Sequence, residues 1–191
     1  MRHKTLIGSM VIALASLGAG VSMGVGVEQT PANPASSTAA ALSAVGAKAE
    51  LKATTGNGVS GTLSLTSVAN GVRITGSIAG LEPNTTHGFH VHEKGDCSAP
   101  DASSAGGHFN PSSQPHGNPA TMERHAGDMA NVVSDAAGNA KLDVVATGVT
   151  LRTGQANDII GKAIVVHQKA DDYKTQPSGD SGSRIACGII K

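Results

Sequence analysis

Residues 61–79 read GTLSLTSVANGVRITGSIA, which is two runs of alternating apolar and polar residues joined by Asn70-Gly71. In the first run, Leu63 and Leu65 alternate with serine and threonine, as expected for a strand that buries one face. The second run, 72–79, has the same period. Asn-Gly is the dipeptide that two-residue hairpin turns prefer. The stretch therefore predicts a β-hairpin with one apolar face.

Short runs of the same kind recur along the chain, with turn residues between them. Together with the hairpin, we expect strands at residues 47–53, 61–68, 72–79, 86–93, 130–134, 140–145, 162–167 and 184–190. About eight short strands separated by turns are typical of an antiparallel sandwich or barrel. No stretch has a convincing helical period, and no internal repeat is seen. We therefore expect an all-β domain.

The composition agrees with this fold class and limits the partners. The chain has 191 residues, enough for one domain with a core. Its 14 basic and 14 acidic residues balance, which disfavours nucleic acid and anionic membrane surfaces as partners. Two phenylalanines and one tyrosine stand against 25 glycines, which suits a β-rich domain with many turns better than a helical bundle.

The N-terminal part of the chain differs from the rest. A basic start and an apolar run at 6–17 form the pattern of an export signal, which we place at residues 1–27. Because residues 5–27 carry no charge, an uncleaved membrane anchor stays open as an alternative. Residues 28–44 are rich in Pro, Ala, Ser and Thr, and we interpret them as a flexible linker. The folded domain is then expected at 45–191.

Export also bears on the cysteines, which are only Cys97 and Cys187. Two cysteines in an exported chain are expected to form one disulfide, because oxidising compartments preserve such bonds. The exported protein is expected in the periplasm if the source is a Gram-negative bacterium, and otherwise secreted or in the cell envelope.

Two long polar segments interrupt the strands: 94–128, the first loop, and 168–183, the second loop. The first loop contains only Phe109 and Met122 as large apolar side chains. A loop of this length in a compact domain is usually functional, or is held by something other than a core. Both loops follow strands that end in histidine.

Histidine is concentrated in this region, since five of the eight in the chain fall between residues 90 and 125. A single histidine is usually a surface or core residue, but that explanation weakens for a cluster. His90 and His92, two residues apart in an expected strand, project from one face, and His167 ends another strand. The first loop adds His108, His116, His125 and Asp128. Copper and zinc prefer imidazole, a carboxylate ligand suits zinc, and metal bonds can order a loop without a core.

At these residues the chain resembles the copper–zinc superoxide dismutases in a bacterial, exported form. The matching motifs are GFHVHE at 88–93, GGHFNP at 106–111, HG at 116–117, HAGD at 125–128, VVH at 165–167 and GSRIACG at 182–188. Their order and spacing agree over about residues 47–191. The resemblance implies an eight-stranded antiparallel Greek-key β-barrel with a long metal-binding loop and a second polar loop.

The resemblance also implies one copper ion and one zinc ion per subunit. Copper would be bound by His90, His92, His108 and His167, and zinc by His108, His116, His125 and Asp128. Asp171 matches the family's aspartate that links a ligand of each metal, although an exposed loop aspartate is the alternative. His87 matches a structural histidine of the family and is left out of the site.

The implied activity is the conversion of superoxide to dioxygen and hydrogen peroxide, which protects against superoxide outside the cytoplasm. Copper would cycle between Cu(II) and Cu(I), while zinc would be structural and tune His108, the bridging and proton-carrying ligand. Arg184 matches the family's arginine beside copper, and a guanidinium suits a small anion, although a surface arginine is the alternative. Apart from an uncleaved N-terminal anchor, which stays open as an alternative, no stable membrane partner is expected, and a homodimer also stays open.

Three other functions account for parts of the sequence. A domain that stores or delivers copper or zinc would typically lack a ligand or the arginine, and this chain has both. A zinc hydrolase of the H-E-x-x-H type is disfavoured, because His92-Glu93 has no second histidine at that spacing. A purely structural domain would leave the histidine cluster unexplained.

Overall fold

The computed structural model describes residues 46–191. The export signal and the linker expected at residues 1–44 lie outside these described residues, as does the expected start of the domain at residue 45. Among the described residues, no helix has the length and apolar character needed to cross a membrane.

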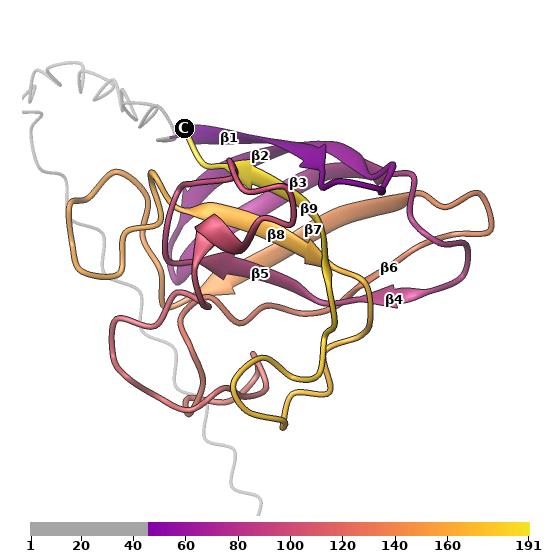
Figure 1. The fold of residues 1–191 in the computed structure, drawn as a ribbon. Helices are drawn as coiled ribbons and strands as arrows, with labels where there is room; N and C mark the ends of the chain where they lie inside the picture. The colour runs from indigo at the N-terminus through magenta and orange to yellow at the C-terminus, as the bar shows by residue number, and fades with distance from the viewer. Residues whose placement is uncertain (1–45) are drawn as a thin grey trace, which may run out of the picture. The chain divides into compact units, whose positions relative to one another are not determined.

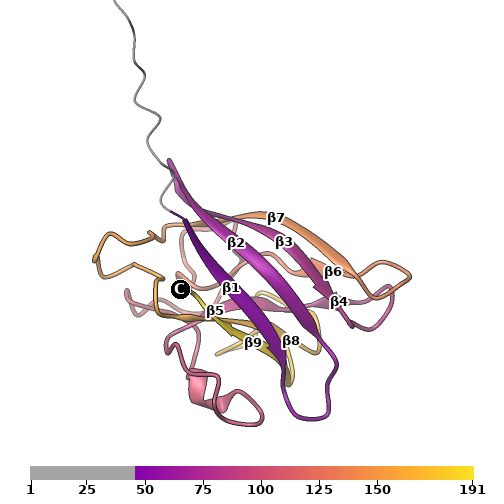
Figure 2. The same ribbon diagram turned by 90° about the horizontal axis from the view of Figure 1, so that it is seen from above.

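The described part is an antiparallel β structure, which confirms the all-β class. Its strands are β1 (Gly46–Ala53), β2 (Ser60–Val68), β3 (Gly71–Ala79), β4 (Thr86–His87), β5 (Phe89–His92), β6 (Val132–Val133), β7 (Ala140–Thr147), β8 (Ala163–His167) and β9 (Arg184–Ile189). Seven of them form one sheet in the order β5-β8-β9-β1-β2-β3-β7, and β4 pairs with β6. Figures 1 and 2 show the long sheet curling round on itself. The first and last strands are neighbours in it, as in Greek-key barrels.

The predicted hairpin is formed by β2 and β3. Leu65 pairs with Ile74 across the two strands, and Leu63 pairs with Gly76. Leu63 and Ile74 are fully buried, so the apolar face of the hairpin packs into the core as its alternation indicates.

The expected strand at 86–93 is divided at Gly88 into β4 and β5, because the chain changes partner there: β4 pairs with β6, and β5 pairs with β8. A Cβ added at Gly88 would lie 2.9 Å from Ser181 Cβ and 3.1 Å from His90 Cε1. A side chain at this position would therefore push apart the residues that meet at the division. The strand expected at 130–134 is shortened to the two residues of β6.

Strands β5 and β8 are buried on both faces, and this positions the site. On one face, Phe89 and Val91 belong to the main core of the barrel. On the other face, Val165 packs with Ala102 and Ala105 of the first loop in a second, smaller cluster. The first loop thus covers the face of β5 from which His90 and His92 project, and Figure 1 shows both long loops on this side of the sheet.

A disulfide joins Cys97 in the first loop to Cys187 on β9, as expected from the sequence. The two cysteines are 90 residues apart. In the chain-entropy model, a crosslink of this span stabilises the fold by about 4–5 kcal/mol. The bond fastens the start of the first loop directly to the barrel.

Candidate metal centre

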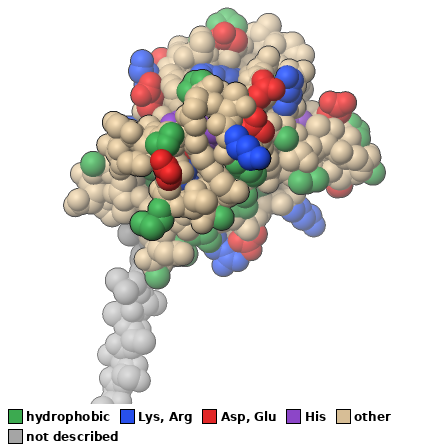
Figure 3. Space-filling view, turned by 90° about the horizontal axis from the view of Figure 1, so that it is seen from below, with side chains coloured by type: hydrophobic (Ala, Val, Ile, Leu, Met, Phe, Trp, Pro, Cys, Tyr) green, Lys and Arg blue, Asp and Glu red, His purple; other side chains and the backbone are tan. Residues whose placement is uncertain are grey.

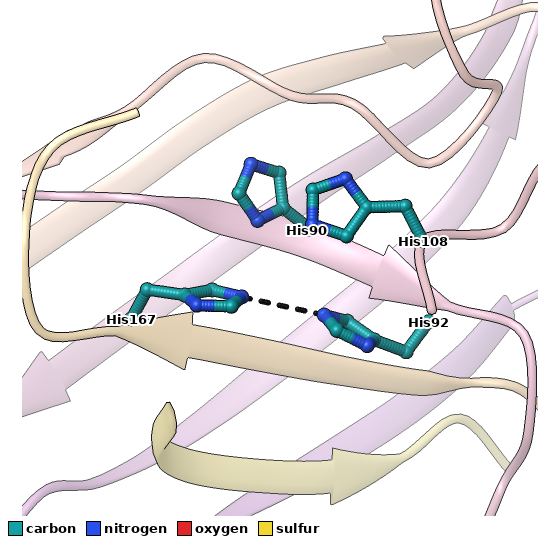
Figure 4. A group of neighbouring side chains, drawn as sticks. All are labelled: His90, His92, His108 and His167. Carbon is teal, nitrogen blue, oxygen red and sulfur yellow. Dashed lines mark hydrogen bonds between the residues drawn. The ribbon is translucent and has the colours of Figure 1, made fainter. Parts of the chain in front are cut away.

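Four histidines converge beside β5 and β8 (Figure 4), and we name them the strand set: His90, His92, His108 and His167. Three of them are on strands, and His108 is brought to β5 by a backbone bridge to His92. One ring nitrogen of each residue lies within 4.8 Å of those of the others. All four side chains are buried.

A second group shares one member with the first, and we name it the loop set: His108, His116, His125 and Asp128. Its ligand atoms also lie within 4.8 Å of one another. Asp128 Oδ1 is 2.8 Å from His108 Nδ1, 3.0 Å from His116 Nδ1 and 3.3 Å from His125 Nδ1. Asp128 Oδ2 accepts the backbone N–H groups of Gly117 and His125. One carboxylate oxygen is thus held by the loop, and the other faces the three rings.

The hydrogen-bond partners fix the tautomers of two rings in the strand set. His92 Nδ1 donates to the carbonyl oxygen of Gly106 at 2.9 Å, and His167 Nδ1 lies 3.3 Å from the carbonyl oxygen of Gly182. A carbonyl can only accept, so both rings carry their proton on Nδ1. The two Nε2 atoms, which lie 3.3 Å apart (dashed in Figure 4), then present lone pairs to each other. This is an arrangement that a cation between them would stabilise.

Asp171 links the two sets. Its Oδ2 accepts from His90 Nε2 at 2.8 Å, and its Oδ1 accepts from His116 Nε2 at 2.9 Å. The bond to His90 places its ring proton on Nε2 and leaves Nδ1 with a lone pair, whereas Nδ1 of His116 lies beside the Asp128 carboxylate and would bind a metal ion in place of a proton. Asp171 is only 3% exposed, so its interpretation as an exposed loop aspartate is wrong.

Burial favours the neutral form of three rings in the strand set. Burial lowers the pKa of His108 to about 4 and the pKa of His167 to about 3. Burial also holds the pKa of His92 well below its ordinary value, and the neighbouring His108 adds to this effect. Neutral imidazoles can donate a lone pair to a metal ion without first losing a proton.

The loop set has the opposite electrostatic character. Burial alone would lower the pKa of His116, but the carboxylates of Asp128 and Asp171 raise it to about 9. For the same two carboxyls burial opposes ionisation, yet hydrogen bonds from the surrounding histidines hold each pKa well below its usual range. Two buried carboxylates around one imidazole suit a divalent cation.

The unpartnered polar atoms test whether metal ions fit these residues. Within residues 46–191, six buried side-chain nitrogens lack a well-oriented hydrogen bond, and four of them belong to the two sets: His90 Nδ1, His108 Nε2, and His116 Nδ1 and His125 Nδ1, which have only the ion-pair contact with Asp128. Leaving one buried polar group unpaired costs about 1–3 kcal/mol. A cation would satisfy all four nitrogens, at His116 in place of the ring proton, and imidazole with one carboxylate is a donor set that copper and zinc prefer. The residues therefore fit both metals.

Arg184 lies next to the strand set. Its Nη1 donates to the carbonyl oxygen of Ala102 and its Nη2 to that of Gly106, each at 2.6 Å. Gly106 thus accepts from both Arg184 and His92, which places the guanidinium beside the strand set. The arginine is partly buried rather than a surface residue.

Several supporting residues were not predicted from the sequence. Gln176 and Asn131 each bind both backbone groups of a site residue: Gln176 those of His116, and Asn131 those of Asp171. Such amide pairs leave no pattern in a sequence. On the face drawn in Figure 3, histidine shows only as small purple patches between other side chains, and the residues of both ligand sets are buried.

An antiparallel barrel that carries two buried ligand sets with one histidine in common defines a protein with a paired metal centre. The family model for copper/zinc superoxide dismutase matches residues 59–190. The chain belongs to this family, as its motifs indicated, and membership implies copper and zinc as its cofactors.

Individual relatives support membership of this family. The chain is 43% identical over 148 residues to superoxide dismutase (Cu-Zn) 2 of Aquifex aeolicus, covering 76% of this chain and 86% of the relative. It is 42% identical over 123 residues to the superoxide dismutase-like protein YojM of Bacillus subtilis, covering 63% of each chain. The solved structure of a SOD-like protein from Bacillus subtilis aligns with a TM-score of 0.68 at 39% identity, covering 74% of this chain and 95% of that chain.

Proposed function

We propose that this chain is an exported copper–zinc superoxide dismutase that binds copper through the strand set and zinc through the loop set. The observation that carries the proposal is that two buried ligand sets share His108. The carboxylate of Asp128 belongs to the loop set alone, and a carboxylate ligand suits zinc better than copper. Asp171 would orient one ligand of each metal.

Dismutation converts two superoxide ions and two protons into one dioxygen and one hydrogen peroxide. Bound copper supplies the one-electron oxidation and reduction, which zinc, with a single oxidation state, cannot supply. The chain must provide a proton close to the substrate. His108 is suited to this, because a metal ion in the loop set would displace the proton that its Nδ1 shares with Asp128 at 2.8 Å, and its buried Nε2, which has no partner, could then hold a proton.

The substrate is a small anion, whereas the chain has no net charge. Attraction must therefore come from local charge. Arg184 is a cation beside the strand set, and two of its five N–H groups are used by the carbonyl oxygens of Ala102 and Gly106. We infer that the rest of the guanidinium guides superoxide to copper. In the second loop, Lys169 is paired with Asp180 at 3.7 Å, so its charge is partly neutralised.

We also propose that residues 1–27 are an export signal, that 28–44 form a linker and that the mature domain starts near residue 45. The disulfide supports an oxidising compartment, such as the periplasm or the cell exterior. The N-terminal mass of protein recovered from the producing cell tests both the cleavage and the retained-anchor alternative.

The function is tested by metal analysis of purified protein combined with pulse-radiolysis rates over a series of salt concentrations. Arg184→Ala should keep both metals, lower the dismutation rate about ten-fold and flatten its decrease with salt. Arg184→Lys should lose less, because it keeps the charge but not the planar guanidinium. Arg73→Ala removes the same charge from an exposed pair on β3 and serves as the control.

The outcomes separate an enzyme from a metal store. A wild-type protein that binds both metals but does not dismutate superoxide would be a store. An Arg184→Ala variant with the full rate and the full salt dependence would show that Arg184 does not guide the anion.

A further inference from the structure

Ser181 is a buried residue of the second loop that neither ligand set contains. It is 1% exposed. Its Oγ lies 3.1 Å from His167 Nδ1 and 2.8 Å from the carbonyl oxygen of Ser178. The hydroxyl therefore contacts His167 at the ring nitrogen opposite the one that faces His92.

The direction of these hydrogen bonds follows from the chemistry of the groups. The carbonyl oxygen of Ser178 can only accept, so it takes the single hydroxyl proton of Ser181. The contact between Ser181 Oγ and His167 Nδ1 must then use the proton of the ring nitrogen. Because the hydroxyl is already committed, it cannot turn and donate to the ring.

The surrounding packing holds Ser181 in place. A Cβ added at Gly88 would lie 2.9 Å from Ser181 Cβ and 3.3 Å from His167 Cβ, so the absence of a side chain there leaves room for this pair. The preceding residue, Asp180, has a left-handed backbone with a φ of 49°, which is uncommon for a residue other than glycine. The loop thus adopts an unfavourable local conformation next to the buried hydroxyl.

We propose that Ser181 is a positioning residue for copper, which fixes the tautomer and orientation of His167 so that Nε2 faces the metal. This inference rests on the proposed function, in which the strand set binds copper. The other strand ligand with a protonated Nδ1, His92, has a backbone acceptor at 2.9 Å. For His167 the backbone acceptor is more distant, at 3.3 Å, and the serine hydroxyl is the nearer partner. A side-chain substitution can therefore loosen His167 but not His92.

The test is Ser181→Ala, compared with Ser183→Ala, which makes the same change at an exposed position of the same loop. Copper and zinc affinities are measured separately by competition with chelators. Ser181→Ala should lower copper affinity about ten-fold, the usual effect of losing a partner behind a ligand, and should leave zinc affinity within about two-fold. Ser183→Ala should change neither.

A second measurement reports the tautomer itself. In zinc-loaded, copper-free protein, the ¹⁵N resonances of His167 should show the proton on Nδ1 in wild type and a mixture of tautomers in Ser181→Ala. Wild type with its proton on Nε2, or unchanged copper affinity in Ser181→Ala, would overturn the inference. Equal losses of copper and zinc affinity would also overturn it, since they would indicate a general effect on the loop.

The variant His167→Ala distinguishes failure of this inference from failure of the proposed function. If His167→Ala binds copper as tightly as wild type, the strand set is not the copper site and the proposed function is wrong. If His167→Ala loses copper while Ser181→Ala keeps it, the copper site stands and only the role of Ser181 is rejected.

Discussion

The strand set and the loop set share His108 but are supported in different ways. His90 and His92 alternate along β5 with Phe89 and Val91, whose side chains are fully buried in the barrel core. The loop set comes from the first loop, where Phe109 joins the barrel core but residues 110–124, which include His116, bury no large apolar side chain. The geometry of the strand set thus follows from packing, whereas the loop set has mainly its own hydrogen bonds to hold it.

This difference shows how one centre can combine a rigid redox site with a metal-dependent loop. The barrel would position three copper ligands whether or not a metal is bound, because strand pairing fixes them. The loop ligands surround Asp128 with three imidazoles, and a cation would replace much of the missing core. The comparison can be tested by removing zinc, by replacing Asp171 and by replacing Gln176.

The largest effect is expected from zinc removal. In copper-free protein, loss of zinc should lower hydrogen-exchange protection in the first loop by about 100-fold or more, because few buried apolar contacts oppose local opening there. Strands β2 and β3 should change by less than about three-fold. Hydrogen exchange followed by mass spectrometry measures both regions in one sample. Loss of protection throughout the barrel would show that the strand set and the loop set are not supported separately.

Much of the fold could be predicted because its signals are local. The alternation around Leu63 and Leu65 and the Asn70-Gly71 turn predict the β2–β3 hairpin without any tertiary information. The division of one expected strand at Gly88 could not be predicted in this way. It depends on the change of pairing partner from β6 to β8, which is a tertiary feature.

The same distinction between local and tertiary signals applies to the candidate site. Its ligand residues were predicted because imidazoles and a carboxylate at family spacing are visible in the sequence. The supporting contacts were not, because Gln176, Asn131 and Ser181 act through backbone groups or through one proton. Such roles depend on where two loops meet, which residue types alone do not reveal.

A substitution of Asp171 tests whether the strand set and the loop set are independent, since Asp171 contacts one residue of each set. Asp171→Asn keeps one acceptor oxygen and replaces the other with a donor, so His90 and His116 can no longer both donate to it. We expect the affinity for each metal to fall by about 10- to 100-fold in competition titrations. Asp180→Asn, in an exposed pair of the same loop, should have little effect. Loss of affinity for only one metal would contradict the linking role.

The smallest expected effect concerns Gln176, which contacts the loop set from the second loop. Its side-chain amide accepts the backbone N–H of His116 at 2.8 Å and donates to the carbonyl oxygen of the same residue at 2.9 Å. This paired contact fastens the second loop to a residue of the loop set without touching the strand set. A substitution of Gln176 can therefore perturb the loop set alone.

Gln176→Ala should lower zinc affinity about five-fold, which corresponds to the loss of about 1 kcal/mol from an exposed hydrogen-bonded pair. Copper affinity should stay within about two-fold, because the strand set is positioned by β5 and β8. Gln168→Ala is the matched control, since its exposed side chain lies in the same loop and makes no hydrogen bond within the described residues. Titrations measure the zinc and copper affinities of wild type, Gln176→Ala and Gln168→Ala. If Gln176→Ala weakened copper binding as much as zinc binding, a contact made only to the loop set would support both sets, and the contrast between the strand set and the loop set would fail.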